Sequence, residues 1–256
     1  MKKLIALLMC ILMIAALMAG CASTDKGMTV QKGKLIMSTN AAFPPYEMTD
    51  DNGNFIGIDV EIAQAVAKEL GLELEINDMG FTAALEAAQN GKSDIVMAGV
   101  SVTPERQDVM LFSESYATGV QVVIVKEGSD VTMDNLGEKM IGTQMGTTGY
   151  LYASDTPENG GYGEDHVTAY ENGMTAVKAL LNGQVDCVII DSAPAQEYVK
   201  ANAGLTILEG SWVEEDYAIG MAKNNTELQK AINEALDKLT KNGTIQSIID
   251  KYIKAE

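Results

Sequence analysis

Short apolar runs alternate with helical patterns along most of this 256-residue chain. Apolar runs without polar alternation predict strands covered on both faces, and strands that alternate with helices predict an α/β fold. Strands are expected at Leu35–Asn40, Phe55–Ile58, Glu73–Asn77, Asp94–Val100, Val120–Val125, Met140–Gln144, Leu205–Leu208 and Tyr217–Met221, and helices at Asp59–Leu70, Thr82–Gln89, Ala193–Ala201, Thr226–Lys241 and Thr244–Ile253.

One helix–strand unit occurs twice. Residues 84–97 read as a helix, an Asn-Gly stop, two further residues, an aspartate and a buried strand, and residues 176–189 repeat this order at a constant offset, since 186 − 94 and 182 − 90 both give 92. The repeat predicts two similar α/β lobes and aligns Gly99 with Asp191 at the ends of the two strands. In open α/β sheets ligands bind beyond the carboxyl ends of the strands, so a cleft is expected there.

The chain is expected to cross between the lobes twice. The crossovers are placed near Tyr116–Gly119 and Trp212–Asp216. Residues 34–117 and 217–256 then form lobe 1, and residues 118–216 form lobe 2. Two crossovers between lobes form a hinge, which permits closure of the lobes on a ligand.

The stretch from Ser101 to Arg106 has the features of a carboxylate receptor. Thr103 is expected at a helix N-cap and Pro104 at the first helical position, where its missing N–H costs nothing. Arg106 then lies in the first turn beside free backbone donors, and its guanidinium can bind a carboxylate with two hydrogen bonds. A solvated surface arginine is the alternative. Asp191 on the other lobe would attract a cation, so the two charges together fit an α-amino acid.

The first twenty residues form a targeting segment. Lys2 and Lys3 give it a basic start, and residues 4–18 form an apolar core that is shorter than the roughly 20 residues of a membrane span. Met18-Ala19-Gly20-Cys21 resembles a bacterial lipobox. Residues 1–20 are therefore expected to be a lipoprotein signal peptide, Cys21 the lipidated N-terminus carrying acyl chains such as palmitate, and residues 21–33 a flexible tether. A secretory signal with an incidental cysteine and a permanent membrane anchor are the alternatives.

Composition limits the partners of the chain. The formal net charge is −18, and removal of Lys2 and Lys3 leaves 16 basic and 36 acidic residues, or −20. This charge argues against nucleic-acid binding, which needs a basic face. Cys187 lies in an apolar run and is expected to be a small core residue, and no Cys/His cluster has the spacing of a metal site. No cofactor is expected.

Six segments, in this order and spacing, resemble the extracytoplasmic solute-binding proteins of family 3, which serve polar amino acid ABC transporters. The resemblance covers essentially the whole chain after its first segment. It implies a type II periplasmic-binding-protein-like clamshell. The segments are Asn40-Ala41-Ala42-Phe43-Pro44-Pro45-Tyr46-Glu47, Gly57-Ile58-Asp59-Val60, Thr103-Pro104-Glu105-Arg106, Phe112-Ser113-Glu114-Ser115-Tyr116, Gly146-Thr147-Thr148-Gly149 and Asn182-Gly183-Gln184-Val185-Asp186.

The resemblance also implies roles for individual residues. Arg106 would bind the ligand α-carboxylate, with further donors from Ser101 and from the helix start at Thr147 and Thr148. The α-ammonium would be bound by the Gly99 carbonyl and by Asp191, which is also expected to cap the helix that follows it. The aromatic side chains of Phe43 and Phe81 align with the pair that brackets the ligand in the family, although core packing is the default for either.

The ligand side chain is expected to meet Asn40 and Gln144, and in addition Tyr46 or Glu47. Relatives that bind basic amino acids often have an acidic residue at the place of Asn40, and a glutamine-binding pattern has lysine at the place of Gln144. The neutral residues here favour a polar uncharged amino acid such as glutamine or cystine, because hydrogen-bonding groups select side chains sharply.

The resemblance implies a monomer that is anchored to the cell membrane on its extracytoplasmic side, in the periplasm or at the cell surface. It would deliver its amino acid to the permease subunits of an ABC importer. Two alternatives belong to other classes. One is a ligand-sensing protein that acts on a receptor, and the other is an enzyme on the same fold, like cyclohexadienyl dehydratase, with Asp191 or Glu47 as acid or base.

Overall fold

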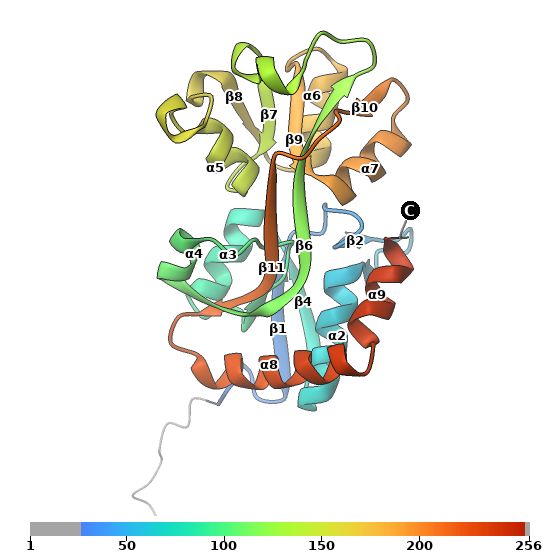
Figure 1. Ribbon diagram of the computed structural model, residues 1–256. Helices are drawn as coiled ribbons and strands as arrows, with labels where there is room; N and C mark the ends of the chain where they lie inside the picture. The colour runs from blue at the N-terminus through green and yellow to red at the C-terminus, as the bar shows by residue number, and fades with distance from the viewer. Residues whose placement is uncertain (1–26, 254–256) are drawn as a thin grey trace, which may run out of the picture.

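The computed structural model describes residues 27–253, which form two α/β lobes joined by two long strands (Figure 1). The signal peptide expected at residues 1–20 and the lipid site expected at Cys21 lie outside the described residues. The helices are α2 (Ile58–Leu70), α3 (Phe81–Gln89), α4 (Pro104–Val109), α5 (Thr148–Ser154), α6 (Gly173–Leu181), α7 (Ser192–Ala201), α8 (Thr226–Lys241) and α9 (Thr244–Tyr252), with 3-10 turns at Met133–Glu138, Pro157–Asn159 and Glu164–His166.

The strands of the described residues form a nine-stranded sheet and one small hairpin. The large sheet has the order β4-β1-β5-β11-β6-β9-β7-β8, with β10 paired to β6. Parallel strands lie at its two ends, one set in each lobe. The strands are β1 (Lys34–Thr39), β2 (Met48–Thr49), β3 (Phe55–Ile56), β4 (Glu73–Asp78), β5 (Ile95–Val96), β6 (Met110–Lys126), β7 (Ile141–Gln144), β8 (Val167–Tyr170), β9 (Cys187–Asp191), β10 (Leu205–Ile207) and β11 (Val213–Ala222).

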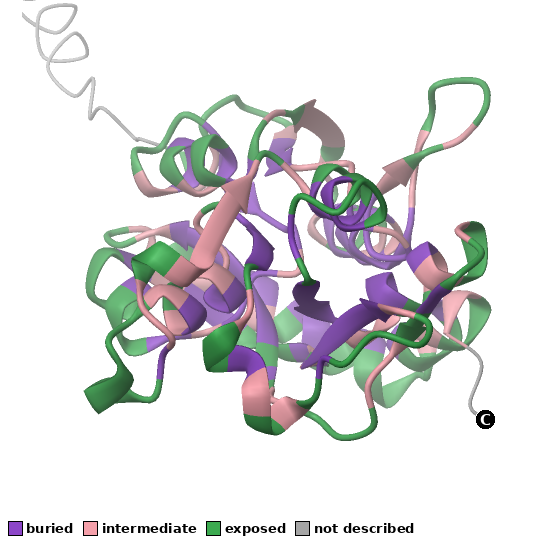
Figure 2. Cartoon of the chain, turned by 90° about the horizontal axis from the view of Figure 1, so that it is seen from above, coloured by how far each residue is buried: buried purple, intermediate pink, exposed green. Residues whose placement is uncertain are grey.

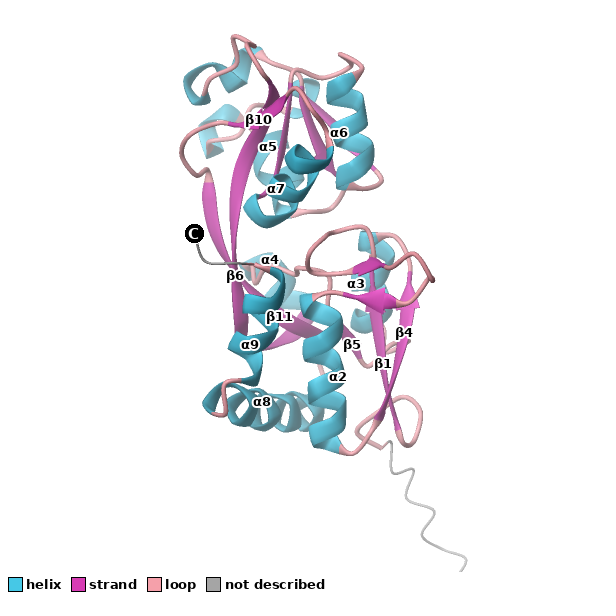
Figure 3. Ribbon diagram, turned by 90° about the vertical axis from the view of Figure 1, so that its right-hand side faces the viewer, coloured by secondary structure: helices cyan, strands magenta, loops and turns pink. Residues whose placement is uncertain are grey.

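The two connections between the lobes are strands, and they contain nearly all of the segments in which the crossovers were expected. β6 and β11 run antiparallel from one lobe into the other (Figures 1 and 3). β6 pairs with β9 in lobe 2 through Gln121–Val125, and β11 pairs with β5 in lobe 1 through Gly220 and Met221. We propose that the lobe boundaries lie at residues 117/118 and 216/217, within this antiparallel pair.

Gly119 lies within the first crossover between the lobes. The residue lies inside β6, and a Cβ atom there would come within 2.4 Å of the Tyr217 hydroxyl oxygen. The missing side chain therefore makes room for the buried ring of Tyr217, which packs edge-on against Tyr46 at a centroid distance of 5.2 Å. Glycine serves close packing at this position and does not end the strand.

The end of the expected tether belongs to lobe 1. The backbone N–H of Val30 donates to the Asp94 carboxylate, and Met28 packs against the main apolar cluster. The Asn225 side chain donates to the Met28 carbonyl at 3.0 Å. Residues 28–30 are therefore tied to the domain, and the prediction of a flexible tether is wrong for this part of residues 21–33.

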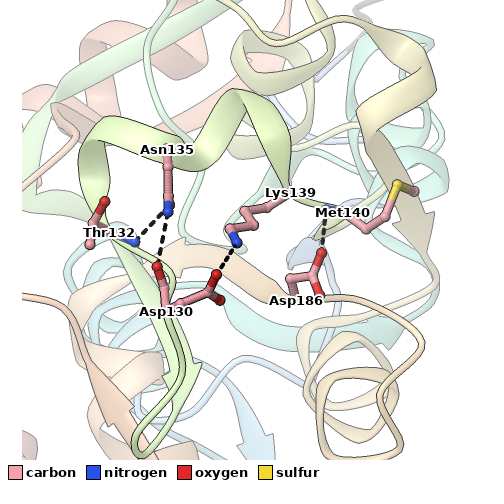
Figure 4. A network of polar contacts seen from close by, with 6 residues as sticks. All are labelled: Asp130, Thr132, Asn135, Lys139, Met140 and Asp186. Carbon is pink, nitrogen blue, oxygen red and sulfur yellow. Dashed lines mark hydrogen bonds and ion pairs between the residues drawn. The ribbon is translucent and has the colours of Figure 1, made fainter.

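The two repeated aspartates have the same structural task in both lobes. The Asp94 carboxylate accepts the backbone N–H of Ile36 at 2.7 Å, next to the start of β1, and Asp186 accepts that of Met140 at 2.8 Å, before β7. Figure 4 shows Asp186 beside the neighbouring ion pair, in which Lys139 Nζ lies 2.8 Å from Asp130 Oδ2. The repeated aspartate therefore makes the same hydrogen bond in both lobes, from the turn between a helix and a strand to the backbone of the neighbouring strand.

Helices cover the sheet on its outer faces, and the buried strand segments lie at the centre of the molecule (Figure 2). In lobe 1 the buried face of α2 packs against α8 and α9. Ile62, Val66, Ile232 and Leu236 are buried in this contact region. Each fully buried aliphatic side chain stabilises the fold by roughly 1.5–3 kcal/mol before entropy is subtracted.

Gly57, the residue before α2, is expected to be the least replaceable glycine of lobe 1. Its φ is +127°, and a Cβ atom would lie 2.2 Å from the Tyr46 carbonyl oxygen. Gly57→Ala should lower the free energy of unfolding by about 3–5 kcal/mol, since backbone strain and a backbone clash add up. Gly53→Ala is the control, because φ is +81° but the space is open, and about 1–2 kcal/mol is expected. Equal losses in denaturant titrations would contradict the clash.

Candidate functional site

A cavity lies between the lobes, and the space not filled by atoms within it, open solvent included, is about 460 Å³. Its wall includes all ten residues that the sequence singled out for ligand binding, together with residues that it ranked lower or missed. The lining residues are Asn40, Phe43, Glu47, Phe81, Ala98, Gly99, Ser101, Arg106, Gln121, Gln144, Thr147, Thr148, Ile189, Ile190 and Asp191.

Hydrogen bonds join the two lobes across this cavity. Gln144 Nε2 of lobe 2 donates to Asn40 Oδ1 of lobe 1 at 2.9 Å, and the Tyr198 hydroxyl donates to the Ala42 carbonyl at 2.9 Å. Arg106 Nη2 donates to the Gly146 carbonyl at 3.1 Å. These contacts place the molecule in a closed arrangement.

Arg106 is the only arginine of the chain and lies where the sequence predicts it. The Thr103 hydroxyl accepts the Arg106 backbone N–H at 3.2 Å as the N-cap of α4, and Pro104 is the first helical residue. The guanidinium is 8% exposed, its carbon lies 5.5 Å from the Phe81 ring centroid, and Nη1 donates to the Ser101 carbonyl at 2.8 Å. Burial lowers the Arg106 pKa, and the charge of Glu215 opposes that shift.

The backbone at Gly99 is held in a shape that favours glycine. Its φ is +56°, and its N–H donates to Asp59 Oδ2 at 2.9 Å, which leaves the carbonyl free for a ligand. A Cβ atom would lie 2.7 Å from Cε1 of Phe43. The missing side chain therefore makes room for the Phe43 ring, in addition to any room for ligand. This bend also ends β5 at Val96, four residues earlier than the predicted strand end.

Asp191 lies at the end of β9 and at the N-cap position of α7. Its side chain makes no capping hydrogen bond, so the predicted second role as a cap is wrong. Gln121 Nε2 donates to Asp191 Oδ2 at 3.0 Å, and the buried Tyr217 hydroxyl lies close enough to favour the charged carboxylate, although Oδ1 has no donor at full hydrogen-bond geometry among residues 27–253. Burial raises the pKa of Asp191 to about 7, which means that a nearby cation would stabilise its charged form strongly.

Glu47 is fully buried in the cavity wall, where no N–H or hydroxyl group of the described residues donates to its oxygens, and its carboxyl group shares a hydrogen bond with that of Asp59. Its position is fixed by the backbone, because its N–H and C=O pair with those of Phe43. Burial, followed by the charge of Asp59, raises the pKa of Glu47 well above its usual range. Asp59 is buried behind it, and the Tyr116 hydroxyl donates to Asp59 Oδ1 at 2.8 Å.

The hydroxyl groups of the cavity have other partners than the sequence suggested. The Thr147 hydroxyl donates to the Gln144 carbonyl at 2.8 Å and accepts the Tyr150 N–H as the N-cap of α5. Thr148 Oγ1 donates to Glu215 Oε2 at 2.6 Å. Gln121, which lines the cavity, and Glu215, which binds the Thr148 hydroxyl, were missed by the sequence prediction, because nothing in the local pattern of β6 or β11 distinguishes these residues from their neighbours.

Asp59 is expected to give the protein a measurable pH dependence of stability. Burial raises its pKa to about 6, against 3.8 for an ordinary aspartate, so between these values the folded chain holds a proton that the unfolded chain has released. The contribution of this proton to stability is present at low pH and is lost as the pH rises through about 6. The melting temperature of the wild type, relative to Asp59→Asn, should therefore fall as the pH rises from 3.8 to about 6 and should level off above that. A constant difference would contradict the buried acid.

Within the described ranges no group of His, Cys, Asp and Glu side chains has the arrangement of a metal site. None of the helices between residues 27 and 253 is both long and apolar enough to span a bilayer.

Comparisons with known proteins agree on one family. The family model described as "Bacterial extracellular solute-binding proteins, family 3" matches residues 35–255. The arginine-binding extracellular protein ArtP of Bacillus subtilis (strain 168) is 31% identical over 100% of both chains. The structure of the arginine-, lysine-, histidine-binding protein ArtJ from Geobacillus stearothermophilus has a TM-score of 0.80 at 34% identity, covering 87% of this chain and 96% of ArtJ. The structure of an ancestral arginine-binding protein bound to glutamine has a TM-score of 0.80 at 35% identity, covering 88% of this chain and 100% of that one.

Proposed function

The chain belongs to the bacterial extracellular solute-binding proteins of family 3, and on that premise we propose that it binds an L-α-amino acid with a cationic side chain and delivers it to an ABC importer. Membership of this family makes it an extracytoplasmic amino acid-binding protein of an ABC transporter, and the family consists of binding proteins and not of enzymes. The cationic side chain is the new element of the proposal.

The main-chain groups of the amino acid fit between Arg106 and Asp191. Arg106 would bind the α-carboxylate through the N–H groups that the Ser101 and Gly146 carbonyls leave free. Asp191 Oδ1, which is buried and has no donor at full hydrogen-bond geometry among the described residues, would accept the α-ammonium together with the Gly99 carbonyl. An amino acid supplies both missing partners at once, and unpaired buried charges are costly.

The main reason to propose a cationic ligand side chain is the environment of Glu47. Its carboxyl group is fully buried in the cavity wall and, among residues 27–253, its hydrogen-bond partner is a second acid, Asp59, and no cation or N–H donor pairs with it, although buried carboxylates are normally paired with such groups. Asp59 behind it adds a second acidic group, while Arg106, which the α-carboxylate would neutralise, is the only basic residue that lines the cavity. A guanidinium or ammonium group at Glu47 would therefore balance the charge of the site. The arginine-binding names of the relatives agree with this assignment.

A polar uncharged amino acid is the second candidate. Asn40 and Gln144, on which the sequence preference was based, do meet in the cavity wall and are hydrogen-bonded to each other at 2.9 Å. Their amide groups could also bind a side-chain amide such as that of glutamine. The ancestral relative bound to glutamine supports this candidate. It leaves Glu47 protonated in the bound state, which its raised pKa permits.

Closure of the lobes would couple binding to delivery. Arg106 and Gly99 belong to lobe 1 and Asp191 to lobe 2, so an amino acid can contact all three only when the lobes are closed. Its contacts therefore differ between the open and closed states, which is the requirement for a ligand to shift the population. The closed form would then dock on the permease. The proposal includes a lipid anchor at Cys21, for which the sequence pattern Met18-Ala19-Gly20-Cys21 is the only support.

A binding screen tests this function. The chain from residue 22 onward, which contains all described residues, is titrated calorimetrically with the twenty amino acids, ornithine and cystine. Arginine, lysine, ornithine or histidine should bind, and a ligand at 100 times its Kd should stabilise the fold by about 2.7 kcal/mol in thermal melts. Binding of neutral amino acids alone would disprove the cationic assignment, and no binding by any amino acid would disprove the function.

A further inference from the structure

The carboxylate of Glu215 lies at the centre of a group of hydrogen bonds between the lobes. Its Oε2 accepts from Thr148 Oγ1 at 2.6 Å, from Ser101 Oγ at 3.1 Å and from Gln121 Nε2 at 3.3 Å. Its Oε1 accepts from the Tyr152 hydroxyl at 3.1 Å. Glu215 is 9% exposed, so these neutral donors replace most of the water that would otherwise solvate its charge.

The donors come from different parts of the fold. Ser101 follows β5 in lobe 1, whereas Thr148 and Tyr152 lie on α5 in lobe 2. Glu215 itself lies on β11 opposite Gly119 of β6, within the pair of strands that connects the lobes. One carboxylate fixed at the hinge therefore binds hydroxyl groups of both lobes in the closed arrangement.

We propose that Glu215 is a closure latch: a positioning residue that stabilises the closed state by holding hydroxyls of both lobes. Opening moves lobe 1 away from lobe 2, so the carboxylate cannot keep both Ser101 and the α5 hydroxyls as partners. Hydrogen bonds to a charged group contribute more than those between neutral groups, and they are shorter. The latch would therefore favour closure whichever amino acid is bound.

The latch also fixes the direction of two hydroxyl protons. A carboxylate can only accept hydrogen bonds, so Ser101 and Thr148 donate their protons to Glu215. The Ser101 hydroxyl oxygen can then accept a hydrogen bond from the ligand, whereas Thr148 Oγ1 already accepts from Gln121 Nε2 at 3.4 Å. This step rests on the proposed function: the α-carboxylate would be bound by Arg106 and backbone N–H groups, and the Ser101 hydroxyl would accept from the ammonium. In this arrangement the Ser101 hydroxyl does not donate to the ligand α-carboxylate, as the sequence had suggested, because its proton is directed to Glu215.

The test compares Glu215→Gln with Glu214→Gln in the chain from residue 22 onward. Glu214 is the exposed neighbour on the same strand, so the control makes the same chemical change outside the cluster. The Kd and the dissociation rate constant are measured by stopped flow for each amino acid that binds. The distance between the lobes is measured with spin labels at Lys92→Cys and Glu158→Cys, two exposed positions in lobes 1 and 2.

Glu215→Gln is expected to raise the Kd about tenfold for every bound amino acid, mainly through faster dissociation, and to shift the lobe distances toward the open form. Glu214→Gln should match the wild type. A lower melting temperature with unchanged Kd, dissociation rate and distances would assign Glu215 a merely structural role and overturn the proposal. The spin-label distances are also compared between Glu215→Gln and the wild type without any amino acid. This comparison tests the latch even if no amino acid binds and the proposed function fails.

Tyr152→Phe provides a second measurement, since Tyr152 donates to Glu215 but does not line the cavity. It should raise the Kd by about threefold in the same direction as Glu215→Gln. In the double variant the two effects should not add, because both changes remove the same interaction. Additive effects would separate Tyr152 from the latch and contradict it.

Discussion

Replacing Arg106 by alanine is expected to raise the Kd for the amino acid by a factor between about thirty and several thousand. Truncation of one partner of a buried, hydrogen-bonded charge pair typically costs about 2–5 kcal/mol, because the ligand carboxylate loses its partner and stays desolvated. Arg106 is 8% exposed and no other arginine exists in the chain, so no neighbouring guanidinium can replace it. Isothermal titration calorimetry measures the change.

Arg106→Lys is the matched variant. It keeps the positive charge but loses the planar fork, and an intermediate loss of affinity is expected. Thermal melts of both variants show whether the domain still folds, since Arg106 Nη1 also binds the Ser101 carbonyl. An alanine variant that folds and binds within threefold of the wild type would disprove the assignment of Arg106 to the α-carboxylate.

Glu47→Gln is expected to have the second largest effect, and this effect should depend on the ligand. For arginine or lysine the Kd should rise about a hundredfold or more, because the side-chain cation loses its buried counter-charge. For a neutral amino acid the affinity should stay the same or increase. The glutamine side chain at position 47 carries no acidic proton, so no carboxyl group at that position has to stay protonated when the ligand binds. Calorimetric titration of wild type and variant with arginine and glutamine measures the contrast.

The control for this experiment is Glu86→Gln, which removes an acidic group from an exposed position on α3 of the same lobe. It should leave all affinities unchanged. Equal losses for arginine and glutamine in Glu47→Gln would mean that Glu47 supports the fold of the cavity and does not select the side chain. The cationic assignment would then lose its main argument.

The helices were predictable because their signals are local. α8 has the predicted bounds, Thr226–Lys241, with the Asn225 side chain as its N-cap and Asn242-Gly243 after its end. The continuity of β6 through Tyr116–Gly119 was not predictable in the same way. It depends on pairing with β11, whose partners lie about a hundred positions later in the chain.

In the site, too, residues with local sequence signals could be predicted, whereas residues whose role depends on long-range packing could not. Arg106 and Gly99 could be placed from the strand end and from the N-cap signal of Thr103 and Pro104. The importance of Glu47 could not be predicted, because it results from burial against Asp59 and from the absence of a cationic partner among the described residues, which only three-dimensional packing reveals. Glu215 lies between two other acidic residues in a strand, where its sequence neighbours resemble those of any solvated acidic stretch.

The interrupted course of lobe 1 has a consequence for the order in which the molecule assembles. β5 pairs with β11, and α2 packs against α8 and α9, so lobe 1 needs residues from both ends of the chain. Lobe 2 is made from one continuous stretch and closes shorter loops, which lowers the entropy cost of its formation. During refolding, pulsed hydrogen exchange should therefore protect β7 and β9 before β1 and β5. Until the last forty or so residues arrive, the apolar side of α2 stays uncovered, and it is there that a chain emerging from an export channel would need a chaperone.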